Sequence, residues 1–175
     1  DWLFIVGWSQ IANEKLLKTP KKGVIGAHPT LLPKGRGRAS IPWAIIKGLK
    51  QTGVTFFKLD SAVDSGPIIS QEVIKIDNDE TSTRLYNKVN KAHQNLIKKL
   101  IPDLLNNKVS ELIQNESKAT YWPQRKPEDG QINLSGSKED AYRLIRALQT
   151  PYPGAFFYND ENKKVIVWEA SIIPY

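Results

Sequence analysis

The feature that most constrains the fold is a long amphipathic segment in the middle of the chain. From Thr81 to Leu105, apolar residues recur every three or four positions, which is the period of an α-helix with one buried face. The stripe consists of Leu85, Val89, Ala92, Leu96, Leu100 and Leu104. Such a helix needs an equally long apolar surface to cover its stripe, so we expect it to pack against a sheet.

Short apolar runs supply the strands of that sheet. Trp2–Gly7 and Gly23–His28 are apolar and end at turn-forming residues, as buried strands do. Gly53–Asp60 and Pro67–Ile76 are predicted as two further strands. The first of these four runs opens the chain directly after Asp1, and the sequence contains no methionine, so we expect further strands of the sheet upstream of it.

A helix is expected between the second and third strands. Ser40 is predicted as its cap, Pro42 lies in its first turn, and Gly48 is placed to end it. Strands that alternate with helices over short connections predict an open, mostly parallel, Rossmann-like α/β sheet. Ligands of such sheets bind beyond the carboxyl ends of strands, and His28 lies at one such end.

The pattern changes near residue 120. After a charged, proline-rich stretch over 121–133, Ser137–Leu148 reads as a capped helix, and Ala155–Tyr158 and Val165–Trp168 read as strands joined by a hairpin turn over 159–162. We therefore expect two units, a main domain built on the sheet over 1–120 and a small β-containing appendage over 121–175.

Composition narrows the chemistry. The 25 Lys and Arg exceed the 18 Asp and Glu, which favours a phosphate-bearing partner such as a nucleotide or an RNA. The chain has no cysteine, and its two histidines are far apart in sequence, so we expect no metal site and a reducing, cytoplasmic setting. No apolar run reaches about 18 residues, which argues against a membrane span.

Two ordered motifs carry a family resemblance. Ala27-His28-Pro29-Thr30-Leu31-Leu32-Pro33 with Arg36-Gly37, and Gly53-Val54-Thr55 with Asp64-Ser65-Gly66-Pro67-Ile68-Ile69, resemble the two signatures of 10-formyltetrahydrofolate-dependent formyltransferases. Residues 125–130 and 145–155 are similar to the C-terminal part of nucleotide-sugar N-formyltransferases. The resemblance implies transfer of a formyl group from 10-formyltetrahydrofolate to the amino group of a nucleotide-linked sugar, in the biosynthesis of surface glycans.

The same resemblance assigns two catalytic residues. His28 would donate to the oxyanion that develops during formyl transfer or take the proton of the amine, and Asp64 would orient the imidazole and stabilise its charge. Without the motifs, His28 would read as a strand-end residue that bonds a backbone carbonyl, and Asp64 as an ordinary turn residue.

One position departs from the family pattern. Asparagine usually stands two residues before the histidine, where its amide donates to the formyl oxygen, and this chain has Gly26 there. The loss of an oxyanion donor costs about 2.7 to 4 kcal/mol unless another group replaces it. We expect a backbone N–H, a water molecule or another residue to take that role.

The binding residues follow from the resemblance and from residue chemistry. The pterin of the folate would lie against Gly7, Trp8, Ser9, Gln10, Ile11 and Val63. A sugar-linked diphosphate would contact the basic loop through Arg36 and Arg38, and the nucleotide would contact Tyr121 and Arg125. The alternatives are a plain strand-to-helix connection, a solvated basic loop, and a role for Tyr121 and Arg125 in pinning the appendage to the main domain.

Two other functions stay open. A methionyl-tRNA formyltransferase would share the catalytic domain and suit the positive charge, although about 55 residues after position 120 are few for the β-barrel of that enzyme. Nucleic acid is a partner only under that alternative. Gly26 and the expected missing strands also leave open an inactive relative, or a fragment that is inactive in isolation. The β-rich C-terminus suggests pairing with a second copy in a homodimer.

Overall fold

The structure, a computed structural model, describes residues 1–8 and 10–173 of the chain. A four-stranded sheet in the order β1-β2-β4-β5 forms its centre. Its strands are β1 (Trp2–Ile5), β2 (Gly23–His28), β4 (Gln51–Lys58) and β5 (Ile68–Lys75). β2 runs parallel to β1, whereas β4 is antiparallel to both of its neighbours, so three of the four strands share one direction. The open α/β sheet expected from the sequence is confirmed.

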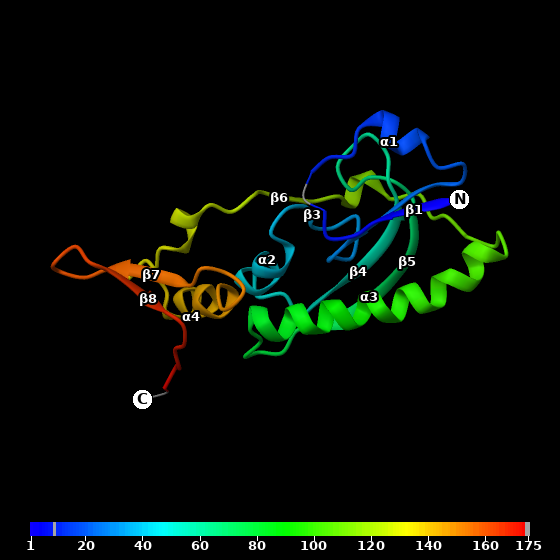
Figure 1. Ribbon diagram of the computed structural model, residues 1–175. Helices are drawn as coiled ribbons and strands as arrows, with labels where there is room; N and C mark the ends of the chain where they lie inside the picture. The colour runs from blue at the N-terminus through cyan, green and yellow to red at the C-terminus, as the bar shows by residue number, and fades with distance from the viewer. Residues whose placement is uncertain (9, 174–175) are drawn as a thin grey trace.

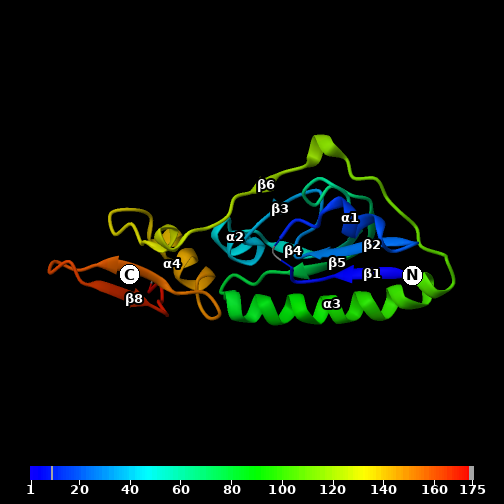
Figure 2. The ribbon, with the colours of Figure 1, turned by 45° about the horizontal axis from the view of Figure 1, so that its top comes forward.

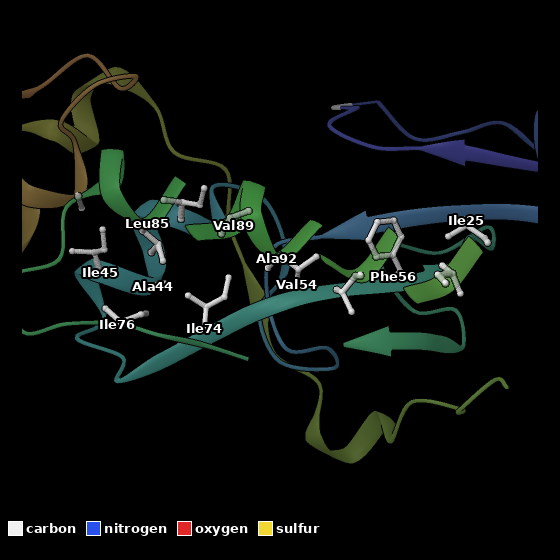
Figure 3. Close-up of a cluster of buried hydrophobic side chains, with 14 of the residues drawn as sticks. Ile25, Ala44, Ile45, Val54, Phe56, Ile74, Ile76, Leu85, Val89 and Ala92 are labelled. Carbon is white, nitrogen blue, oxygen red and sulfur yellow. The ribbon is translucent and has the colours of Figure 1, made fainter. Parts of the chain in front are cut away.

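One face of the sheet is covered by α3 (Ser82–Leu105) (Figures 1 and 2). All six residues of its predicted stripe are buried, from Leu85 to Leu104. They pack against side chains of β2 and β4, among them Ile25, Val54 and Phe56 (Figure 3). The helix begins after Thr81, whose hydroxyl accepts a hydrogen bond from the Arg84 amide. Local periodicity therefore predicted both the helix and the face that it buries.

The opposite face carries short elements and loops (Figure 2). These include α1 (Glu14–Lys18) and the two-residue strands β3 (Arg36–Gly37) and β6 (Tyr121–Trp122), which pair in parallel. The loop over 59–66 begins beside β2, where the Leu59 amide donates to the Val24 carbonyl. Leu59 of this loop packs against a small apolar cluster of Leu32, Phe57 and Ile68.

The helix α2 (Ser40–Ile46) lies at one end of the sheet. It ends before Gly48 as expected, but the prediction of Ser40 as its cap is wrong. The cap is Ala39, which has a φ of 55° and makes no side-chain cap hydrogen bond. Ser40 instead turns its hydroxyl toward His28, because the bend at Ala39 places it inside the first turn.

The C-terminal part contains the remaining elements: α4 (Lys138–Ala147), the hairpin of β7 (Ala155–Tyr158) and β8 (Lys164–Val167), and 3-10 turns over Glu116–Lys118 and Pro127–Gly130. It has a small apolar core around Ile132, Ile145, Leu148 and Ala155. It lies beside α2 and the start of α3 (Figure 1), where the Ser82 hydroxyl donates to the Gln149 carbonyl. The small C-terminal strand pair is thus confirmed, and the division near residue 120 stays our interpretation.

Candidate active site

His28 ends β2 on the face opposite α3. Its imidazole is buried, and Nε2 lies 2.8 Å from the Gly35 carbonyl oxygen and 3.3 Å from the Ser40 hydroxyl. A carbonyl oxygen only accepts, so Nε2 carries the hydrogen in this contact. The second ring nitrogen, Nδ1, is thereby directed at the loop over 59–66.

Asp64 is the residue of that loop that meets the ring. Its Oδ2 lies 3.5 Å from His28 Nδ1, although 36 positions separate the two residues in sequence. The same oxygen accepts a hydrogen bond of 2.8 Å from the Gly37 amide. The Asp64 side chain is 18% exposed against 8% for His28, so the carboxylate is the member of the pair that reaches solvent.

The Gly37 amide that bonds the Asp64 carboxylate is held in place because the Gly37 backbone lies close to β6. Its φ is 105°, and a Cβ at this position would lie 2.4 Å from the backbone oxygen of Trp122. Only glycine fits both the backbone conformation and the space. The β3–β6 pairing therefore fixes the amide that orients Asp64.

This arrangement suits proton transfer next to a developing negative charge. When the ring carries a second proton, Nδ1–H faces the Asp64 carboxylate while Nε2–H keeps the Gly35 carbonyl, so the imidazolium has an acceptor on each side. The carboxylate can then stabilise that cation and pass its proton on to solvent.

The space beside His28 where the family carries an asparagine is filled by an apolar side chain. A Cβ at Gly26 would lie 2.5 Å from Cδ2 of Leu59 and 3.0 Å from its Cγ. Gly26 and His28 share a face because they are two positions apart in β2. Leu59 thus fills the space into which a side chain at position 26 would extend.

The residues predicted to bind folate are exposed where the structure describes them. Trp8, Ile11 and Val63 are 64%, 72% and 43% exposed, and Gly7 and Gln10 are also exposed. Ser9 lies outside the described residues. The loop after β1 starts beside Gly26, the register partner of Ile5, so apolar surface adjoins the polar pair. This fits the face of a flat heterocyclic ring next to His28, and folate binding there stays a prediction.

The prediction that Arg36 contacts a phosphate is wrong. Arg36 is fully buried, and its guanidinium donates to Gln114, Glu116 and Tyr121 rather than facing solvent from a flexible loop. These hydrogen bonds, the one with Glu116 above all, raise the pKa of Arg36. The residue is therefore a fixed structural cation.

The other three predicted substrate residues lie at the surface or close to it. Arg38 is exposed and donates to Gln124, and Tyr121 is 60% exposed with its hydroxyl accepting from Arg36. Arg125 is half-buried over the ring of Trp43, 5.0 Å from its centroid, which links this segment to α2 as the pinning alternative expects. Substrate contacts of these three residues stay predictions.

Sequence reasoning missed Gln114, whose side chain reaches the backbone of Asp64 and Gly66. It lies in the connection after α3, where no local pattern marks a glutamine as functional.

Among the described residues, no cluster of three or more His, Asp or Glu could hold a metal ion, and none of the described helices is long and apolar enough to cross a bilayer.

The comparisons to known proteins agree with the fold. The chain belongs to the formyl transferase family: the formyl transferase model matches residues 1–101, and the model of the formyl transferase C-terminal domain matches residues 125–175. Members of this family are enzymes that transfer formyl groups.

Individual relatives show how much of a longer protein this chain resembles. The bifunctional polymyxin resistance protein ArnA of Wigglesworthia glossinidia brevipalpis is 40% identical over 172 residues, which cover 98% of this chain and 26% of that protein. The chain therefore spans about a quarter of the length of this curated relative.

Two crystal structures extend the comparison. A 4-N formyltransferase from Francisella tularensis has a TM-score of 0.84 and 30% identity, covering 95% of this chain and 69% of its own. The N-formyltransferase from Helicobacter canadensis, in complex with folinic acid and dTDP-3-aminofucose, has a TM-score of 0.71 and 25% identity, covering 82% of this chain and 53% of its own.

Proposed function

We propose that the protein containing this chain transfers a formyl group from 10-formyltetrahydrofolate to the amino group of a nucleotide-linked amino sugar, in the biosynthesis of surface glycans. The observation that carries the proposal is the contact of His28 Nδ1 with Asp64 Oδ2 beside exposed apolar residues. The folate and dTDP-sugar bound by the Helicobacter canadensis relative, and the similarity to ArnA, support the two substrates.

The chemistry needs two proton movements that the pair can serve. The amine nitrogen attacks the formyl carbon, the carbonyl oxygen becomes an oxyanion, and the bond from that carbon to N10 of the folate then breaks. The attacking amine loses a proton and N10 gains one, so the transfer balances. We assign proton exchange to His28 and charge stabilisation of its imidazolium to Asp64.

The test uses the full-length protein with 10-formyltetrahydrofolate and a panel of UDP- and dTDP-linked 3-amino and 4-amino sugars, following tetrahydrofolate release and product mass. We expect turnover with one acceptor, and a loss of about 10²- to 10⁴-fold in kcat for His28→Gln, the range for a general acid–base residue. His93→Gln is the matched control, because His93 lies on α3 and bonds the Val89 carbonyl away from the site.

The opposite results are equally distinct. Formylation of charged initiator tRNA, with no sugar accepted, would move the assignment to methionyl-tRNA formyltransferase. Full activity in His28→Gln would remove the histidine from the mechanism. No formylation of any acceptor by the full-length protein would favour the inactive relative suggested by Gly26.

A further inference from the structure

Arg36 is buried next to Gly37, whose amide bonds Asp64, and the proposed chemistry assigns Arg36 no role. Arg36 has five N–H donors, and all five are used within the protein. Gln114 Oε1 accepts two of these bonds, at 3.2 and 2.8 Å, the Glu116 carboxylate accepts two, and the Tyr121 hydroxyl accepts one. The guanidinium is therefore held in one orientation, with two of its N–H groups directed at Gln114.

Gln114 connects the Arg36 guanidinium to the loop of Asp64. Its side-chain amide Nε2 donates to the Asp64 carbonyl at 2.9 Å and to the Gly66 carbonyl at 2.7 Å. Arginine can only donate, so the amide oxygen of Gln114 must face Arg36 and the NH2 group must face the loop. Arg36 thus decides which end of the Gln114 amide meets the loop.

The Asp64 backbone needs such support. Its φ of 52° is left-handed, a conformation that costs a non-glycine residue free energy and persists only where the surroundings hold it. Gln114 is 5% exposed, so its bonds to the two carbonyls are protected from competing water. The direction of the Asp64 side chain follows from this backbone conformation.

We propose that Gln114, oriented by Arg36, is the positioning residue that holds Asp64 against His28. The inference deepens the proposed function and rests on it, because the pair matters only if it performs the transfer. It also gives buried Arg36 a role at the site in place of the phosphate contact that the sequence suggested.

The decisive variant is Gln114→Glu in the full-length protein. Glutamate keeps the size and the acceptor for Arg36 but has no donor for the carbonyls of Asp64 and Gly66, so it removes both positioning bonds and places a carboxylate oxygen against these carbonyls. Gln114→Met, which is uncharged and of similar length, is the second variant in case the new carboxylate disturbs folding. Gln149→Glu is the matched control, since its amide also donates to a backbone carbonyl, that of Trp168, far from the site.

The first readout needs no substrate. The ¹⁵N and ¹H resonances of the His28 imidazole, identified by their absence in His28→Gln, report whether Nδ1 faces a carboxylate. Asp64→Asn supplies the reference spectrum without that carboxylate. We expect both Gln114 variants to move the resonances toward this reference, and Gln149→Glu to keep the wild-type spectrum.

The second readout is kinetic. We expect kcat to fall about 10- to 100-fold in both Gln114 variants, the scale for misplacing a catalytic group by about 1 Å, with KM changed by less than about twofold. Wild-type His28 resonances in both variants would overturn the inference, and so would wild-type kcat. If the resonances move but even the wild-type protein formylates no acceptor, the positioning role stands and the proposed function fails.

Discussion

At the scale of single residues, the absence of a side chain at Gly26 and the position of the Leu59 side chain depend on each other. The position two residues before His28 has no side chain of its own, and Leu59 fills the space that a side chain would need. A substitution at Gly26 must therefore displace Leu59, and the two positions should show strong coupling.

We expect Gly26→Asn to destabilise the protein by about 1 to 3 kcal/mol, because its Cβ would lie 2.5 Å from Leu59 Cδ2 and the leucine must repack. Leu59→Ala in the same chain should recover part of that loss by making room. Urea denaturation of the four proteins of this double-mutant cycle measures the coupling. Additive effects would show that Leu59 does not fill the space.

The same cycle tests how the site manages without the asparagine amide. If another group already stabilises the oxyanion, Gly26→Asn with Leu59→Ala should change kcat little. A rise in kcat of about 10²-fold or more would contradict that replacement, since this is the contribution of one oxyanion donor.

The contrast between His28 and Arg36 shows what sequence can and cannot predict at a site. The pair of His28 and Asp64 was expected from two motifs, and the structure brings the residues within 3.5 Å. Arg36 was misjudged because its main partners, Gln114 and Glu116, lie 78 and 80 positions away, and nothing local announces them. Burial of a charge depends on such distant partners.

At the scale of elements, α3 is the best-predicted part of the molecule. Helix periodicity is a local property, so the sequence fixes which side chains face the sheet. The two-residue strands β3 and β6 were not predicted, because they exist only through the pairing of Arg36 with Tyr121 and of Gly37 with Trp122. Those pairings join segments that only the tertiary fold brings together.

The buried stripe of α3 gives a matched pair of substitutions. Leu96→Ala should lower the free energy of unfolding by about 2 to 5 kcal/mol, because Leu96 is 1% exposed and its loss leaves a cavity under the sheet. Leu105→Ala should change it by less than about 0.5 kcal/mol, since Leu105 is 76% exposed at the end of the same helix. Urea denaturation measures both, and equal effects would contradict the assigned face.

At the scale of the whole molecule, the main core and the smaller C-terminal core meet at the end of the sheet, where α4 packs against α2. Ala147 of α4 belongs to the main core, although its neighbours Ile145 and Leu148 belong to the smaller C-terminal one. Trp43 donates from its indole to the Pro123 carbonyl and receives the Arg125 guanidinium over its ring. The segment that carries Gln114 lies along the chain between α3 and these attachments.

The stability of the molecule should also depend on pH through His93, which lies between the two main layers. Its ring packs edge-on against Phe56 of β4, at 5.8 Å between centroids, and burial lowers its pKa because the charged form is desolvated. The folded state then binds fewer protons than the unfolded state near pH 6.5, so the free energy of unfolding decreases as the pH falls through that value.

We expect unfolding measured between pH 7.5 and 5 to show this decrease in the wild-type protein, with a slope of up to about 1.4 kcal/mol per pH unit, the limit for one proton. His93→Gln should have a shallower slope, because glutamine does not titrate and the carboxylates titrate mainly below about pH 4.5. His93→Phe should show the same shallower slope. Because phenylalanine cannot bond the Val89 carbonyl whereas glutamine has a donor, equal slopes in the two variants would show that the loss of titration, and not the loss of that bond, is responsible. Slopes as steep in both variants as in the wild type would assign the pH dependence to other groups.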